Sequence, residues 1–178
     1  EAIKFIKKNR KNNFFIFFYN WDTHTPFDIL PMKYKHKFYD KKSNYTVKEM
    51  LNKIKDDKWR EIVKNYHLYG VKYMDEIPAL YDGAVNLFDD TIKKLYNTLE
   101  YLGIAEKTII VITGDHGDNP IIDDVFVGHF GLYEPVIHVP LMIFGPDIPK
   151  NKTVESFVQH VDIFPTLLDL LKIDYGKY

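Results

Sequence analysis

The chain has 178 residues, of which 46% are hydrophobic, and its formal net charge is -1. This is enough for one ordinary domain with a core of its own, and the composition argues against disorder. With 24 Lys and Arg against 25 Asp and Glu, nothing indicates a nucleic acid or an anionic membrane as partner. The absence of cysteine excludes disulfides, thiolate metal ligands and a cysteine nucleophile within this chain. No apolar stretch reaches the roughly 20 residues of a transmembrane helix, and the cellular compartment stays undetermined.

The first half of the chain predicts one strand among several helices. Apolar residues among the lysines of residues 2–8 indicate the end of an amphipathic helix. The run FFIFFY at residues 14–19 is typical of a strand buried on both faces. Residues 28–45 are basic and irregular, and we expect a solvated loop, with an anion-facing role as the alternative. A capping-box spacing predicts a helix over residues 46–55, and a second helical stretch is expected over residues 59–73.

The second half alternates long helices with apolar strands. Apolar residues recur every three or four positions from Asp82 to Leu102, which predicts a helix that Gly103 ends. The runs TIIVIT (residues 108–113) and VPLMIF (residues 139–144) predict buried strands. The closing FPTLLDLLKI predicts a last helix, with its proline in the first turn. This alternation predicts an α/β fold with a parallel or mostly parallel sheet.

Two of the predicted strands lead to histidines. The first leads to His24 in DTHTP, and the second leads to Asp115 and His116 in VITGDHGDN. Ligands of such sheets gather beyond the carboxyl ends of the strands. We therefore expect these side chains to lie close together.

Asp115 and His116 allow two interpretations. Adjacent side chains on a strand point to opposite faces, but the flanking Gly114 and Gly117 give the backbone freedom to turn both toward one ion. A carboxylate with an imidazole suits Mn, Zn or Fe, and Ca accepts an imidazole among several oxygens. Two ligands are too few for a complete site, so other segments must contribute. The alternative is a polar pair that caps the turn after a buried strand.

His24 and His129 also allow two interpretations. Each could be a loop histidine bonded to the backbone. Each could instead donate a proton to a leaving group or hold an oxyanion, because an imidazole titrates near neutral pH. His129 stands in VGHFGLYEP, between glycines and between two predicted strands. The other histidines have no comparable context, and we assign them no function: His36, His67, His138 and His160.

Four motifs in order resemble the sulfatase family of the alkaline-phosphatase-like superfamily. They are FFIFFYNWDTHTPF, the helix-strand segment that ends in TIIVITGDHGD, GHFGLYEPVIHVPLMIFGP, and VQHVDIFPTLLDLLKI. They cover nearly the whole chain apart from residues 28–80, which are only loosely similar. The resemblance implies an alkaline-phosphatase-like α/β fold, in which a mostly parallel central sheet is flanked by helices. It also implies that residues 1–178 form the C-terminal portion of one catalytic domain.

The resemblance assigns roles to four residues. Asp115 and His116 would coordinate a divalent cation, usually Ca²⁺ in sulfatases. His24 would contact the sulfate ester. His129 stands where many members have Lys, four residues before the Tyr of the motif, and would bind sulfate or act as general acid. Histidine in place of lysine makes this charge depend on pH.

The family nucleophile is absent from this sequence. It is a Cys or Ser of a C/S-x-P-S-R motif, converted to formylglycine, and an N-terminal Asp pair supplies the other metal ligands. Neither Ser43 nor Ser156 stands in such a motif. We expect the formylglycine outside this chain, a requirement for the N-terminal half of the domain, and no activity of this chain alone.

The resemblance predicts hydrolysis of a sulfate ester, carried by a small molecule or a glycan. One alternative keeps the superfamily but changes the substrate: a phosphodiesterase, a phosphonate hydrolase or a phosphoethanolamine-type transferase, with Mn²⁺ or Zn²⁺ and a Thr or unmodified Ser nucleophile. A second alternative is a non-catalytic fragment or binding module that complements a separate N-terminal chain. The Tyr-Glu and Val-Pro features favour the sulfatase.

Overall fold

The structure is a computed structural model of the chain. It describes residues 1–40, 42–118, 121–122, 125–126, 128–174 and 176. The chain divides into two compact units, Glu1–Pro146 and Asp147–Tyr178. The histidines and the carboxylate singled out from the sequence all belong to the first unit.

The first unit begins with helix α1 (Ala2–Asn9), which is followed by an extended segment rather than the predicted strand. Within residues 14–19 the side chains of Phe15 and Phe17 are 77% and 81% exposed. A strand is held by hydrogen bonds to a neighbour, and none of the described strands pairs with this run. The prediction of a strand buried on both faces is therefore wrong for this structure. Phe14 packs edge-on against Phe5, with 6.2 Å between ring centroids.

Residues 28–45, predicted to be a loop, overlap two short helices that contribute to the core. The 3-10 turn η1 (Phe27–Ile29) and helix α2 (Met32–Lys35) pack against the long helix α5 (Glu76–Tyr101). The cluster consists of Phe27, Leu30, Tyr34, Leu80 and Ala84. Gly83 permits this approach, because a Cβ there would lie 2.4 Å from the carbonyl oxygen of Tyr34.

The capping box predicted at Thr46 is confirmed. The Thr46 side chain accepts a hydrogen bond from the Glu49 amide, and the Glu49 carboxylate accepts one from the Thr46 amide. The helix that it begins, α3 (Val47–Leu51), ends before Lys55.

The predicted helix of residues 59–73 is shorter than expected. Helix α4 (Asp57–Ile62) continues into one π-helical turn, η2 (Val63–His67), and the helical structure ends there. The side chains of this region form the larger buried cluster, which consists of Val47, Met50, Ile54, Val63, Leu68, Met74 and Ile77.

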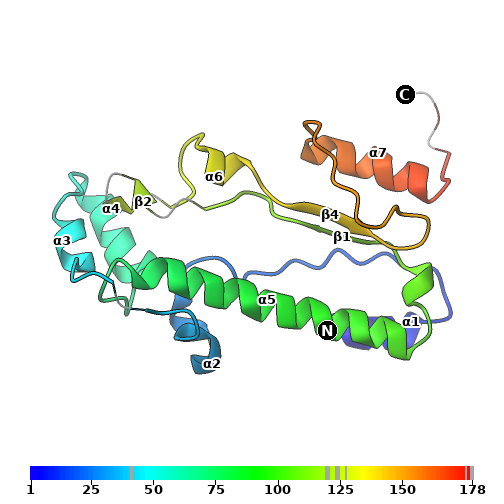
Figure 1. Cartoon of the computed structure of the whole chain (residues 1–178), viewed down its shortest axis with the longest axis horizontal. Helices are drawn as coiled ribbons and strands as arrows, with labels where there is room; N and C mark the ends of the chain where they lie inside the picture. Colours follow the sequence, from blue (N-terminus) through cyan, green and yellow to red (C-terminus); the bar gives the residue numbers. More distant parts are fainter. Residues whose placement is uncertain (41, 119–120, 123–124, 127, 175, 177–178) are drawn as a thin grey trace. The chain divides into compact units, whose positions relative to one another are not determined.

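Helix α5 is the longest element of the chain (Figure 1). It begins at Glu76, six residues before the predicted start at Asp82, and its last residue is Tyr101. Gly103 follows with φ +68°, the left-handed conformation expected of a residue that ends a helix. The short 3-10 turn η3 (Ala105–Lys107) leads to the first strand.

The described strands all pair in an antiparallel manner. Strand β1 (Ile110–Thr113) pairs with β4 (Leu141–Phe144), and β2 (Ile121–Ile122) pairs with β3 (Val125–Phe126). Mixed helices and strands agree with the α/β class, but the mostly parallel sheet is not confirmed. An apolar run carries no information on the direction of the neighbouring strand, which is why the sequence pattern could not supply it.

The second unit contains helix α7 (His160–Leu170). A capping box formed by Gln159 and Asp162 sets its start. Pro165 therefore lies inside the helix and not in its first turn, so the predicted start was wrong. Glutamine is outside the group of preferred N-cap residues, so the sequence pattern did not mark this cap.

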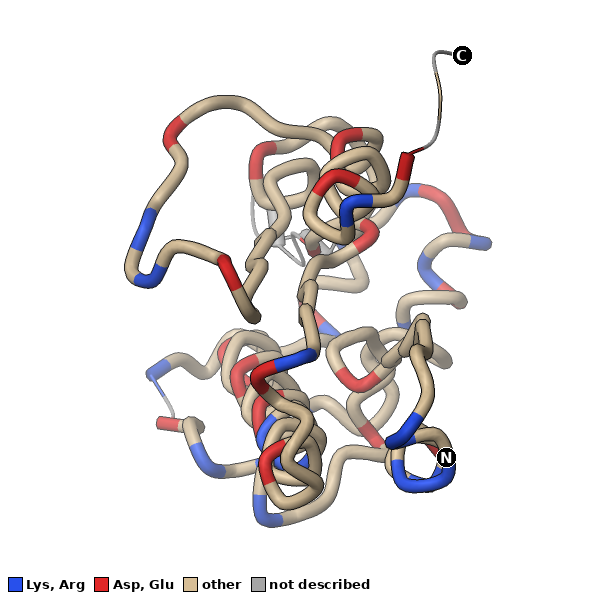
Figure 2. The backbone as a smooth tube through the Cα atoms, turned by 90° about the vertical axis from the view of Figure 1, so that its right-hand side faces the viewer, with Lys and Arg blue, Asp and Glu red and all other residues tan. Residues whose placement is uncertain are grey.

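Charges of both signs are distributed along the chain, and Lys residues are frequent in α1 at the N-terminus (Figure 2). Among the described residues, no helix combines the length and the apolar character that crossing a membrane requires.

Candidate functional site

Four histidine rings lie close together in the first unit. The ring centroids of His116 and His129 are 4.4 Å apart, and His24 lies 5.6 Å from His129 and 6.5 Å from His116. The fourth ring, that of His67, lies 6.3 Å from His24. The structure thus brings together the three histidines singled out from the sequence and adds a fourth.

Asp115 and His116 follow strand β1 after the intervening Gly114. The His116 amide donates a hydrogen bond of 3.0 Å to the Asp115 carboxylate. The Nδ1 of His116 lies 2.8 Å from the Gly117 carbonyl oxygen, which can only accept, so Nδ1 carries the proton of the neutral ring. The lone pair of Nε2 is then available to a ligand, and this atom lies 4.0 Å from the Asp115 carboxylate.

Gly117 holds this segment against helix α6 (Glu134–Ile137), which follows the loop of His129. Its amide donates a hydrogen bond of 2.7 Å to the carbonyl oxygen of Val136. A Cβ at this position would lie 1.9 Å from the carbonyl oxygen of Pro135, closer than any real contact. Only glycine fits here, which explains why one follows the Asp-His pair.

His24 is fixed by its own neighbours. Its Nδ1 donates a short hydrogen bond to the carbonyl oxygen of Thr25, so Nε2 is unprotonated in the neutral ring. One face of the ring stacks on Trp21, with centroids 4.2 Å apart and planes 28° apart. The Thr25–Pro26 peptide bond is cis.

His129 is half-buried, and its ring stacks on Phe130 with centroids 5.0 Å apart. Burial lowers the pKa of His129, and the nearby His116 lowers it further, while the carboxylate of Asp118 opposes this shift. The protein environment therefore disfavours a positive charge on the His129 ring.

Sequence reasoning assigned no function to His67, but it is only 7% exposed. Its Nδ1 and the Thr25 hydroxyl oxygen are 2.6 Å apart and share a hydrogen bond. Burial lowers the pKa of His67 to about 4, and His24 and His129 add to this shift. The sequence offered one signal that His67 could be buried. Trp59, Val63 and His67 are spaced by four residues, which places all three on one face of the predicted helix.

Residues of the DTHTP motif and of the VITGDHGDN motif line one small cavity of about 60 Å³. It lies between the segment of His24 and the segment of Asp115 and His116. Its lining consists of Tyr19, Asn20, Trp21, Thr23, His24, Tyr81, Asp115, His116, Gly117 and Asp118. The cavity has room for an ion or a water molecule among polar groups.

The donors at this cavity fit part of the shell of a divalent cation. A carboxylate and an imidazole nitrogen are ligands that Mn²⁺, Zn²⁺ and Ca²⁺ accept. The backbone carbonyl that binds the Nδ1–H of His116 is the kind of partner that orients metal-binding histidines. In the part of the chain that the structure describes, no three His, Asp or Glu side chains form a group that could hold an ion. Asp115 and His116 therefore fit as two ligands of a larger set.

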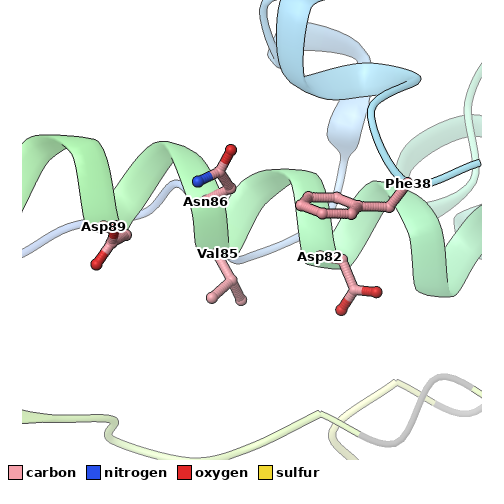
Figure 3. Close-up of a pocket in the computed structure, with 5 residues that line it drawn as sticks. All are labelled: Phe38, Asp82, Val85, Asn86 and Asp89. Atoms are coloured by element: carbon pink, nitrogen blue, oxygen red, sulfur yellow. The ribbon is translucent and has the colours of Figure 1, made fainter.

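A larger cavity of about 380 Å³ lies on helix α5 (Figure 3). Its lining consists of Phe38, Asp82, Val85, Asn86 and Asp89, and the side chains of Asp82, Val85 and Asp89 leave the same side of the helix. None of the four histidines lines it. We place the candidate site at the smaller cavity, because its lining combines a carboxylate with imidazole rings.

Curated sulfatases are similar to this chain. Bovine (Bos taurus) arylsulfatase K is 37% identical over 102 residues, which are 57% of this chain and 19% of that protein. Human (Homo sapiens) N-acetylglucosamine-6-sulfatase is 36% identical over 89 residues, which are 50% of this chain and 16% of that protein. The Drosophila melanogaster homolog of extracellular sulfatase SULF-1 is 37% identical over 89 residues, 46% of this chain and 7% of that protein.

The chain thus spans less than a fifth of the length of these relatives. No solved structure matches it. The sulfatase family model matches residues 1–173, which is nearly the whole sequence. The chain therefore belongs to the sulfatase family.

Proposed function

We propose that this chain supplies the part of a sulfatase active site that binds the metal and the sulfate group, in an enzyme that hydrolyses sulfate esters. The convergence of His24, His116 and His129 beside Asp115 carries the proposal, because these groups come from three separate segments and His24 is distant from the other two in the sequence. We expect the substrate to be a sulfate ester of a small molecule or a glycan.

Asp115 and His116 would hold a divalent cation together with ligands from outside this chain. A cation there would supply positive charge that stabilises the negative charge on the sulfate oxygens. His116 would bind through Nε2, because its Nδ1 proton is committed to the Gly117 carbonyl oxygen. The resemblance to sulfatases favours Ca²⁺, whereas Mn²⁺ or Zn²⁺ would accompany a phosphoesterase.

His24 and His129 would act on the ester itself. With the Nδ1 of His24 committed to Thr25, Nε2 would be the atom that, in the imidazolium form, donates a proton to the departing oxygen of the leaving group. His129 would hold a sulfate oxygen or serve as the acid. Its lowered pKa disfavours the charged form, and a bound sulfate group would favour that form.

The nucleophile would come from residues outside this chain. Ser43 lies outside the helices and strands, where its hydroxyl oxygen accepts a hydrogen bond from the Tyr45 amide, and Ser156 belongs to the second unit. A formylglycine and an Asp pair in an N-terminal half would complete the site. We infer that the strands described here would then belong to a larger, mostly parallel sheet.

The test compares sulfate and phosphate esters. The chain, extended by its upstream coding sequence, is assayed with p-nitrophenyl sulfate and with bis(p-nitrophenyl) phosphate. We expect hydrolysis of the sulfate ester, a loss of at least about 1,000-fold in Asp115→Ala, and unchanged turnover in Asp89→Ala, which alters only the larger cavity. Hydrolysis of the phosphodiester alone would favour the phosphoesterase, and no turnover of either ester would favour a binding module.

A further inference from the structure

We propose that His67 is a positioning residue for His24, and that it acts through the hydroxyl group of Thr25. The inference rests on the proposed function only for the consequence in catalysis. The contact itself is a property of the fold, because it joins positions that are 42 residues apart in the sequence.

The contact between Thr25 and His67 is almost completely shielded from water. Thr25 is 2% exposed and His67 is 7% exposed, and the hydroxyl oxygen lies 2.6 Å from Nδ1. A buried hydrogen bond of this kind leaves a polar atom unsatisfied when one partner is removed, which costs about 1–3 kcal/mol in general. The pair therefore constrains the position of Thr25 strongly.

Thr25 transmits this constraint to His24. Its carbonyl oxygen accepts the Nδ1 proton of His24, while its hydroxyl group bonds to His67. When the Thr25 side chain is fixed, the carbonyl group and hence the tautomer and orientation of the His24 ring are fixed as well. Trp21 stacks on the ring and restricts its tilt. Together these contacts keep Nε2 of His24 as the unprotonated nitrogen of the neutral ring.

The surroundings of His67 suit this role. The π-helical turn that ends at His67 follows a helix carrying Trp59, whose ring centroid lies 5.5 Å from that of His67. The Tyr66 ring meets it edge-on at 5.2 Å. Burial lowers the pKa of His67 to about 4, so the ring is neutral near pH 7.

His67 is a positioning residue rather than a catalytic one. Of the described residues, it is not among those that line the small cavity, whereas His24 is. Its partner at Nδ1 is a side chain of the protein, not a group that reacts. Its effect on a reaction would therefore pass through Thr25 and His24.

The test uses matched substitutions on both sides of the contact. In His67→Asn an amide group takes the place of Nδ1 and can donate to or accept from the Thr25 hydroxyl, whereas His67→Gln places its amide one bond further away. His67→Leu removes the contact, and Thr25→Val removes it while keeping the shape of the side chain and the His67 ring. The first measurement is the tautomer of His24, from the ¹⁵N chemical shifts of its ring in the 178-residue chain.

We expect the Nδ1–H tautomer of His24 in the unmodified chain and in His67→Asn. In His67→Leu, His67→Gln and Thr25→Val we expect a mixture of tautomers. In the protein extended by its upstream segment, kcat for an aryl sulfate should fall about 10- to 100-fold in the latter three variants, with little change in KM, and His67→Asn should restore it to within about 3-fold.

An unchanged His24 tautomer in a folded Thr25→Val variant would overturn the proposal, even if His67→Leu fails to fold. Equal losses of kcat in His67→Asn and His67→Leu would also overturn the proposal. Such a result would mean that the polar atom at the Nδ1 position does not matter and that His67 acts only through packing. If the tautomer responds as expected but the extended protein hydrolyses no sulfate ester, the positioning contact stands and the proposed function fails.

Discussion

The amide of Gly117 donates a 2.7 Å hydrogen bond to the carbonyl oxygen of Val136, and this bond joins the segment of Asp115 and His116 to helix α6. The two backbones approach so closely that a Cβ on Gly117 would lie 1.9 Å from the carbonyl oxygen of Pro135. The loop of His129 precedes α6, so the contact fixes how the two segments of the candidate site face each other.

Gly117→Ala should therefore separate these segments. We expect a loss of about 2–4 kcal/mol in the free energy of unfolding, measured by urea denaturation, because backbone must move to admit the methyl group. Gly114→Ala is the matched control in the same loop. Its Cβ would lie 3.2 Å from the carbonyl oxygen of His116, which requires a shift of only a few tenths of an ångström. Equal stability of Gly117→Ala and the unmodified chain would contradict this account.

Gly83→Ala tests the packing of α2 on α5. In an exposed helix this change would stabilise the protein by about 1 kcal/mol, because alanine has the higher helix propensity. Here the Cβ would lie 2.4 Å from the carbonyl oxygen of Tyr34, so we expect the sign to reverse, with a loss of about 1–3 kcal/mol. Asn97→Ala, at an exposed position of the same helix, should stabilise slightly. A Gly83→Ala variant that melts above the unmodified chain would exclude this close contact.

The lowered pKa of His67 predicts a loss of stability in mild acid. The unfolded chain takes up a proton near the ordinary histidine pKa of 6.5, whereas the folded chain resists until about pH 4. Between these values the unfolded state binds more protons, so the free energy of unfolding falls as the pH falls, by at most about 1.4 kcal/mol per pH unit. The stabilising contribution of the neutral His67 is fully present above pH 6.5.

His67→Asn isolates this contribution, because asparagine does not titrate and can keep the hydrogen bond to Thr25. Urea denaturation at pH values from 7 to 5 should show a steeper loss in the unmodified chain than in the variant. Parallel curves for the two proteins would mean that the folded chain protonates His67 as readily as the unfolded chain does.

The exposed aromatic residues of the extended segment predict self-association. Phe15 and Phe17 are 77% and 81% exposed, and their backbone lies outside the described sheets. An extended apolar segment without strand partners is a template for pairing with another chain. The double variant Phe15→Thr, Phe17→Thr should therefore have a lower average mass than the unmodified chain when both are measured at high concentration by analytical ultracentrifugation. Ile16→Thr, which alters a less exposed side chain of the same run, serves as the comparison. Self-association that persists in the double variant would exclude this segment as its cause.

The sequence predicted those features that depend on local pattern. The capping box at Thr46 and the end of the long helix at Gly103 follow from contacts within a few residues, and both are confirmed. The closeness of His24 and His116 could be predicted because each follows an apolar run. For His129 the sequence suggested a role only through the family resemblance, and the fold brings its ring to 4.4 Å from that of His116.

Features that depend on distant contacts could not be predicted in the same way. The run at residues 14–19 has the composition of a buried strand, but strand structure depends on a partner that composition does not reveal. Helix α7 begins at a cap formed by glutamine, outside the preferred set, so Pro165 was placed wrongly. His67 stands in no motif, and its importance arises only from the fold, which brings Thr25 within 2.6 Å.

The central claim is that Asp115 and His116 bind a divalent cation beside His24 and His129. It is tested most directly by titrating Mn²⁺ into the 178-residue chain and recording the NMR signals of each histidine ring, because the paramagnetic ion broadens nearby nuclei even when binding is weak. We predict that the His116 signals broaden at the lowest Mn²⁺ concentration and that those of His24 and His129 follow. The signals of the exposed His36 should stay sharp. In Asp115→Ala the His116 signals should no longer broaden before the others. Equal broadening of His36 and His116, or an unchanged response in Asp115→Ala, would contradict the claim.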